Sequence, residues 1–276
     1  MKKKKSQFPH SVEKQLRFIL STNSSKLIKR YKEVLKKDKN AEFEEVEFSN
    51  AEKKKIINDL TKVAIATNKH VFESWRTLTD DELKMTDLKG AKYWIRENYL
   101  RVKNMNKTFA EKMTVIRDDK YRELLKTFNG SLDFRFDKLA NGRITNADID
   151  KLLTQLKANY NPNSEIKTLI EKLEKTRNLK SEEIKTLQSW ANRRNELWAR
   201  NETGNICASQ LQDLWLENGI EKYIWRTEQD SRVRLEHMEK EGKIFEVGVG
   251  IMPMEEFGCR CWAEPIRAKK EDKNGD

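Results

Sequence analysis

The residues best suited to chemistry lie in the last quarter of the chain. His237 is followed by a Cys-x-Cys pair, Cys259 and Cys261. A neutral imidazole and two thiolates are ligands that Zn²⁺ accepts, and Asp230, Glu255 or water would complete a tetrahedron. In the structural alternative, the cysteines share one face of a strand and pack as small apolar side chains, while Asp230 or a backbone carbonyl holds His237. The structural interpretation, with no cofactor, is favoured, and zinc is the alternative.

Charged side chains near these residues predict ion pairs that fix the fold. The carboxylate of Asp230 can pair with the guanidinium of Arg232, Arg234 or Arg260. Arg232 and Arg234 are two positions apart, so they do not share a face of a helix. We therefore expect one of them to lock the fold and the other to face solvent or a partner.

The same segment contains the parts of a metal-independent ribonuclease. His237 would be the general base, Arg232 would clamp a phosphate, and Thr227 and Asp230 would supply a hydroxyl and an orienting carboxylate. Cys259 beside His237 suggests a thiol nucleophile as a second version. Clustered ionisable residues are often structural, however. The expected class is a non-enzymatic protein, and a nuclease-like toxin or processing module is the alternative.

The predicted secondary structure that positions these residues changes from long helices to short strands and turns near Gly219. Upstream, apolar residues recur at spacings of three, four and seven, which predicts long helices with breaks near residues 21–23 and 203–204. Capping-box spacing at residues 49–52 and 79–82 predicts helix starts. Downstream, β-forming residues and turn residues predict a compact α+β arrangement.

Short elements are predicted in two further places. After Gly219, which resembles a helix C-cap, we expect strands at residues 223–225, 244–245 and 261–263, the last closed by Pro265. We expect Asp230 to cap a brief helix between the first two strands. Two Asn-Gly turns at 129–130 and 141–142 frame a turn of helix or a small hairpin that contains Phe134 and Phe136.

These expectations define a fold class and a domain division. The protein is predicted to be mainly α-helical with a small C-terminal α+β domain. The helical region covers residues 1–197, the α+β domain covers 198–267, and residues 268–276 form a polar tail.

The charge of the chain favours anionic partners. The formal net charge is +11, and charged residues make up 37% of the sequence. Residues 221–276 hold 11 basic and 13 acidic side chains, so the positive excess lies in residues 1–220. Such a field attracts polyanions, and non-specific contact with double-stranded DNA is one candidate. The alternative is a solvated lysine-rich surface. The basic residues proposed for DNA contact are Lys29, Arg30, Lys53 and Lys54.

The chain also carries signals about its compartment. Three cysteines, two of them in Cys-x-Cys, do not form a disulfide framework, which fits a reducing compartment. No apolar stretch follows residues 1–5, so we expect no signal peptide. No run of about 18 apolar residues predicts a membrane span. We expect a cytoplasmic protein with no membrane partner.

Residues 198–266 resemble the Mu F-like minor head proteins of tailed bacteriophages, the phage head morphogenesis family. The pattern runs from an A-R-T-E-like helix through W-x-T-x-x-D-x-R-V-R-x-x-H and G-x-x-F to C-R-C, and the residue types, order and gaps agree. The motif residues are Glu202, Trp225, Thr227, Asp230, Arg232, Arg234, His237, Gly242, Cys259, Arg260 and Cys261.

The resemblance implies a phage or prophage minor capsid protein that acts in head and procapsid assembly. It implies association with the portal protein and with capsid or scaffold proteins. It also implies a place inside the virion head near packaged DNA, or in the bacterial host cytoplasm during assembly.

Overall fold

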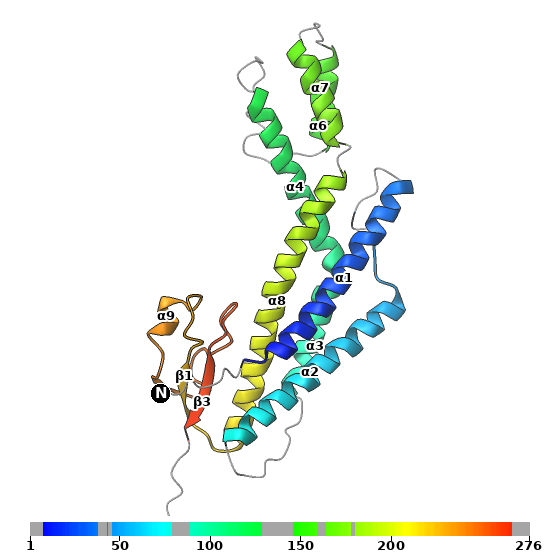
Figure 1. The fold of residues 1–276 in the computed structure, drawn as a ribbon. Coiled ribbons are helices and arrows are strands. Elements are labelled where there is room, and N and C mark those ends of the chain that lie inside the picture. The colour runs from blue at the N-terminus through cyan, green and yellow to red at the C-terminus, as the bar shows by residue number, and fades with distance from the viewer. Residues whose placement is uncertain are drawn as a thin grey trace, which may run out of the picture. The chain divides into compact units, whose positions relative to one another are not determined.

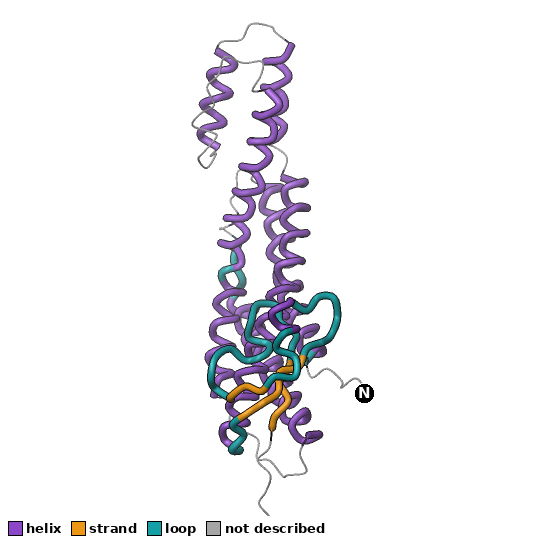
Figure 2. Tube along the Cα trace, turned by 90° about the vertical axis from the view of Figure 1, so that its left-hand side faces the viewer, coloured by secondary structure: helices purple, strands orange, loops and turns teal. Residues whose placement is uncertain are grey.

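The structure is a computed structural model that describes residues 8–37, 43, 46–78, 89–128, 146–158, 164–177 and 180–266. In these ranges the chain is mostly helical, and strands occur only beyond residue 220 (Figures 1 and 2). The predicted fold class is therefore confirmed. The packing divides the chain into two units. Unit 1 comprises Met1–Asn23, Phe48–Lys103 and Arg193–Asp276, and unit 2 comprises Ser24–Glu47 and Asn104–Asn192.

Helix α1 (His10–Lys37) is continuous, so the expected break near residues 21–23 is wrong. The side-chain amide of Asn23 donates to the carbonyl of Ile19 at 2.8 Å, four residues earlier. A polar side chain that bonds its own helix in this way need not interrupt it. Leu16 and Leu20, one turn apart, are fully buried.

Helix α2 (Asn50–Leu78) begins at the predicted capping box. The backbone N–H of Ser49 donates to the Glu52 carboxylate at 2.9 Å, and the N–H of Glu52 donates to the Ser49 hydroxyl at 3.3 Å. The two bonds satisfy N–H groups that a helix start leaves without partners. Helix α3 (Lys89–Lys103) follows in unit 1 and packs against α2.

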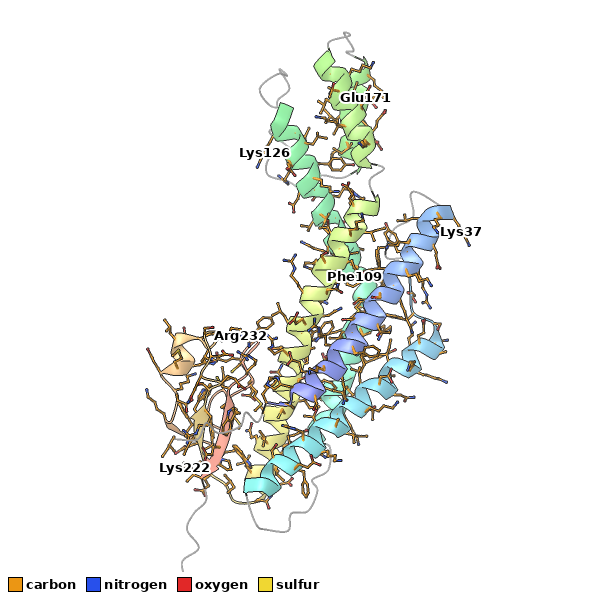
Figure 3. The ribbon with its side chains drawn as sticks, in the orientation of Figure 1. Lys37, Phe109, Lys126, Glu171, Lys222 and Arg232 are labelled. Carbon is orange, nitrogen blue, oxygen red and sulfur yellow. The ribbon has the colours of Figure 1, made fainter. Side chains whose placement is uncertain are left out.

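Unit 2 is built from helices. Its apolar cluster joins α4 (Met105–Phe128), α6 (Asn146–Ala158) and α7 (Ser164–Arg177). Phe109 of α4, labelled in Figure 3, meets the rings of Phe43 and Trp190 edge-on at centroid distances of 5.5 and 6.1 Å. The predicted capping box at 79–82 and the predicted piece around Phe134 and Phe136 lie outside the described residues.

Helix α8 (Lys180–Glu217) contributes to both units and is not interrupted near residues 203–204, contrary to expectation. It ends as predicted at Gly219, whose φ of +69° is a left-handed conformation that glycine adopts without a steric penalty. The N–H of Ile220 closes the end by donating to the Trp215 carbonyl at 2.9 Å. The predicted domain boundary at 197/198 falls inside α8, and the domain division stays a prediction.

Residues 220–266, here called the C-terminal cap, contain a three-stranded antiparallel sheet. The order is β2-β1-β3, with β1 (Lys222–Arg226) between β2 (Ile244–Glu246) and β3 (Trp262–Ile266). All three strands were predicted. Pro265 does not close β3 but lies within it, which is tolerated because β3 is an edge strand.

The C-terminal half of α8 packs on this sheet within unit 1 (Figure 1). Trp215 of α8 and Tyr223 and Trp225 of β1 are at most 1% exposed and belong to one apolar cluster with Cys259 and Cys261. The sheet is small, so its stability depends on this helix contact.

Candidate functional site

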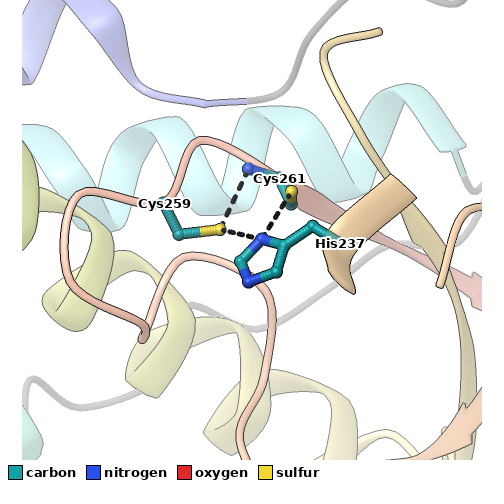
Figure 4. Close-up of side chains that lie close together, drawn as sticks. All are labelled: His237, Cys259 and Cys261. Carbon is teal, nitrogen blue, oxygen red and sulfur yellow. Dashed lines mark hydrogen bonds between the residues drawn. The ribbon is translucent and has the colours of Figure 1, made fainter. Parts of the chain in front are cut away.

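The centre of the cap is the group His237, Cys259 and Cys261. His237 lies on α9 (Leu235–Met238), and the cysteines flank Arg260 just before β3. The Nδ1 atom of His237 is 3.4 Å from each sulfur (Figure 4). All three side chains are at most 5% exposed, and their ligand atoms lie within 4.8 Å of one another. The fold therefore brings together the three residues that the sequence nominated as metal ligands.

Glu256 holds the other nitrogen of the imidazole. Its carboxylate is 2.6 Å from Nε2 of His237 and also accepts hydrogen bonds from Arg234 at 2.8 Å and Lys240 at 3.4 Å. Burial alone would raise the pKa of Glu256, but the hydrogen bond from His237 and the charges of His237 and Lys240 hold that pKa below its usual value. The expectation that Asp230 or a backbone carbonyl would hold His237 is wrong.

The pKa values of the two thiols move in opposite directions. The hydrogen bond from Cys261 lowers the pKa of Cys259 to about 6, against the opposing effect of burial, and the neighbouring His237 also favours the thiolate. The same hydrogen bond, together with burial, raises the pKa of Cys261. One sulfur of the pair is thus predisposed to carry negative charge, a property shared by metal ligands and by nucleophiles.

Asp230 belongs to a different ion pair. Both of its oxygens accept from Nη2 of Arg260, at 3.0 and 2.9 Å, and it also accepts from the N–H of Arg232 at 3.0 Å. The hydrogen bond from Arg260 is the main reason that the pKa of Asp230 is lowered. Asp230 does not cap a helix as predicted, because its backbone carbonyl accepts from the N–H of Val233 to close a turn at residues 230–233 and α9 begins only at Leu235.

The two arginines at 232 and 234 differ as expected. Arg234 donates to Glu256 and to the carbonyl of Phe257, so it ties α9 to the loop before Cys259. The side chain of Arg232, labelled in Figure 3, is 71% exposed and reaches only the Asp230 carboxylate at 3.3 Å in the described contacts. Arg232 is therefore the arginine that faces solvent.

Thr227 is bound at a third place. Its N–H and hydroxyl both donate to Oε2 of Glu241, at 2.5 and 2.8 Å. Arg226 links the same Glu241 to Glu264 of β3, with its Nε 2.7 Å from the Glu264 carboxylate. Next to Glu241, Gly242 has a φ of +77°. At this turn the N–H of Gly242 donates to the carbonyl of Trp225 at 2.9 Å, and the N–H of Trp225 donates to the carbonyl of Lys243 at 2.9 Å.

The described contacts separate the residues of the ribonuclease alternative. His237 is bound to Glu256 and the cysteines, Thr227 to Glu241, and Asp230 to Arg260 and Arg232. His237 is also only 2% exposed, so its imidazole does not face a substrate. General base catalysis needs these groups within hydrogen-bond reach of one reacting atom, and this geometry does not provide that.

Comparison with known proteins identifies this region. Residues 153–264 match the family model described as phage Mu protein F like protein. Over these residues the chain is similar to the Mu F-like phage proteins. An uncharacterized protein of Haemophilus influenzae (strain Rd) is 36% identical over 77 residues, which cover 26% of this chain and 17% of that protein. No solved structure gives a significant match.

The Mu F-like match includes Glu202, a motif residue that lies on α8 rather than in the cap. It is 5% exposed, and its carboxylate accepts hydrogen bonds from Asn98 at 3.0 Å and from Arg101, both on α3. Its backbone carbonyl accepts from the indole of Trp94 at 3.0 Å. Glu202 therefore anchors α3 to α8, a role that sequence spacing did not indicate.

At Gly204, two residues further along α8, the loop before Cys259 lies close against this helix. A Cβ at this position would lie 2.4 Å from the carbonyl oxygen of Met254. The glycine that suggested a helix break instead gives the loop before Cys259 room to contact the helix.

The basic residues nominated for DNA contact do not belong to one unit. Lys29 and Arg30 lie in unit 2, whereas Lys53 and Lys54 lie in unit 1. Lys29 and Lys54 are exposed, while the guanidinium of Arg30 donates to the carbonyl of Glu47 at 2.8 Å. None of the described helices is both long and apolar enough to cross a membrane.

Three glutamates that hold the Mu F-like cap together were not predicted: Glu241, Glu256 and Glu264. The sequence places Glu256 three residues before Cys259, but only its neighbour Glu255 was considered, as a fourth zinc ligand. Glu255 instead accepts from the backbone N–H of Met252 at 2.7 Å. Adjacent glutamates in a loop have no periodicity to tell them apart, so the available signal was only that the arginines and the histidine of the motif need acidic partners.

Proposed function

We propose that the protein is a minor head protein of a tailed phage or prophage and acts in capsid assembly by docking to the portal protein. The observation that carries this proposal is the Mu F-like match over residues 153–264, which spans the second half of the described chain and almost the whole cap. The family is one of phage head morphogenesis, and its partners are capsid components.

The construction of the cap supports docking as the mechanism. Three acidic side chains, Asp230, Glu241 and Glu256, each bind two or more partners and fix loops that contain little regular structure. Fixed loops lose less conformational entropy on binding than mobile ones. The cap therefore provides a rigid platform.

The cap also exposes apolar side chains that a partner can cover. Five of them are at least 58% exposed, and exposed apolar surface is frequently a protein interaction site. They are Leu235 at 78%, Ile244 at 61%, Val249 at 62%, Ile251 at 58% and Phe257 at 62%.

Co-expression with the portal protein of the same phage or prophage tests the proposal. We expect the full chain to co-purify with the portal and to enter procapsids when coat and scaffold proteins are added. The variant Leu235→Ser/Phe257→Ser should lose at least ten-fold of the co-purified portal. Phe18→Ser is the matched control, because Phe18 is 72% exposed on α1, outside the cap.

Two outcomes would overturn this function. The first is a folded full chain that neither binds the portal nor enters procapsids. The second is cleavage of RNA that depends on His237, which would favour the nuclease alternative. In the proposed role the protein is found in the host cytoplasm during assembly and inside the virion head afterwards.

A further inference from the structure

We propose that His237, Cys259 and Cys261 bind one Zn²⁺ ion that staples α9 to the start of β3. The ion is structural, and it is held by one imidazole nitrogen, two thiolates and a water molecule.

The distances fit a tetrahedral zinc ion. With Zn–N near 2.05 Å and Zn–S near 2.3 Å, tetrahedral ligands place nitrogen and sulfur about 3.6 Å apart. The Nδ1 atom of His237 is 3.4 Å from both sulfurs, and the three ligand atoms lie within 4.8 Å of one another, so the ion requires the two sulfurs to lie about 3.8 Å apart. Cys259 and Cys261 are two residues apart in an extended segment, so their side chains lie on the same side of the backbone.

The hydrogen bond to Glu256 prepares the imidazole for a cation. A carboxylate only accepts hydrogen bonds, so the 2.6 Å contact places a proton on Nε2 of His237. When the ring is neutral, Nδ1 then carries the lone pair, and this nitrogen is 3.4 Å from both sulfurs. Metal-binding histidines commonly donate their other N–H to a carboxylate in this way, which fixes the tautomer and the ring orientation.

Other neighbours suit thiolate ligands. The backbone N–H of Cys261 donates to Sγ of Cys259 at 3.3 Å, which stabilises negative charge on that sulfur. The ring of Trp225 meets the imidazole edge-on at a centroid distance of 5.4 Å. The three side chains are at most 5% exposed, so the ion would lie inside the cap, between α9 and the start of β3.

The cap has a physical need for such a staple. Helix α9 has four residues and strand β2 has three, and elements of this length do not persist without tertiary support. His237 is 22 and 24 residues from the two cysteines in the sequence, so one ion would link the two ends of the segment between α9 and β3.

Metal analysis of the full chain tests the site. Purified from zinc-supplemented cells without chelator, the protein should contain about one zinc per chain. The variants Cys259→Ser and Cys261→Ser should each lose most of it. Cys207→Ser is the matched control, because Cys207 is a buried thiol of the same apolar cluster and should leave the zinc content unchanged. A wild-type chain without zinc, or cysteine variants that keep it, would overturn the proposal.

Cobalt binding to the wild-type chain covers the case in which those variants fail to fold. After chelation and refilling with Co²⁺, we expect thiolate-to-cobalt charge-transfer bands and the visible absorption of a tetrahedral ion. Glu256→Gln should weaken zinc affinity by about 10–100-fold while keeping one site per chain. Cobalt spectra without thiolate bands, or unchanged affinity in Glu256→Gln, would contradict the assignment. Neither result depends on portal binding, so this proposal and the docking proposal can fail separately.

Discussion

At the scale of single residues, the Mu F-like motif is a set of ionic partners more than a set of reactive groups. Arg260 is the clearest example, since it stands between two candidate zinc ligands while its own side chain binds Asp230. Its position in the Cys-Arg-Cys triplet therefore connects the cysteines to the turn at residues 230–233. The acidic partners decide which basic residues are structural and which, like Arg232, remain exposed.

The Asp230–Arg260 pair predicts a pH dependence of stability. The pKa of Asp230 is lowered in the folded state from its ordinary value of 3.8. A lowered carboxyl pKa stabilises the fold above the unfolded pKa, and this contribution disappears as the pH falls through the lower folded pKa. Because the carboxylate is 33% exposed, we expect less than about 1 kcal/mol.

Urea unfolding of wild type and Asp230→Asn between pH 7 and pH 3 measures this effect. The difference in free energy of unfolding should be constant from pH 7 to about pH 5 and then shrink toward pH 3. A difference that grows as the pH falls would contradict the assigned direction.

At the scale of elements, α8 is the helix that contacts both α3 and the sheet of the cap. It carries the buried Glu202 that binds α3, and three turns later the Trp215 that packs on β1. Gly204 sits between these contacts, where the loop before Cys259 approaches the helix. The helix therefore needs a continuous backbone and one position without a side chain.

Gly204→Ala sets two effects of opposite sign against each other. Alanine favours a helix over glycine by about 1 kcal/mol. A Cβ placed 2.4 Å from the Met254 carbonyl must displace the loop, and overpacking of this kind costs about 1–3 kcal/mol. Because the obstacle is backbone, we expect a net loss of about 1 kcal/mol in the free energy of unfolding.

Denaturant unfolding of Gly204→Ala, with Asn205→Ala as the control, measures whether the free energy of unfolding falls as expected. Asn205 is a half-buried neighbour on the same helix, and its replacement tests helix propensity without the loop contact. Asn205→Ala should be neutral or slightly stabilising. Gly204→Ala as stable as wild type would mean that the loop gives way without penalty.

At the scale of the whole molecule, the charge is divided in a way that fits two kinds of contact. The positive excess lies in residues 1–220, whereas residues 221–276 are close to neutral. A nearly neutral cap with exposed apolar side chains suits a protein partner, and lysine-rich helices suit phosphates. DNA contact remains a proposal that charge alone supports.

A salt series of filter-binding measurements tests the DNA contact. If the helices bind phosphates, log K for a random duplex should fall linearly with log salt. Lys29→Ala/Lys54→Ala should reduce the slope by about one or two, because each lost phosphate contact removes about 0.9. Lys222→Ala/Lys243→Ala, which removes the same number of charges from exposed positions of the cap, should leave it unchanged. Absence of binding at low salt would remove DNA from the functional account.

The sequence by itself determined the class of the fold, the long helices, the three strands and the grouping of His237 with Cys259 and Cys261. These follow from periodicity, turn residues and motif spacing, which are local properties of the chain. It also determined the end of α8 at Gly219, because a glycine after an apolar helix indicates the cap directly.

Only the tertiary structure decided which carboxylate accepts hydrogen bonds from which side chain. It assigned Glu256 to His237, Asp230 to Arg260 and Glu241 to Thr227, and it showed that Gly204 makes room for a loop instead of breaking a helix. The physical reason is that these hydrogen bonds, ion pairs and the contact between Gly204 and Met254 join residues 14 to 50 positions apart in the sequence. Local sequence does not encode which of several chemically equivalent partners the fold brings within 3 Å.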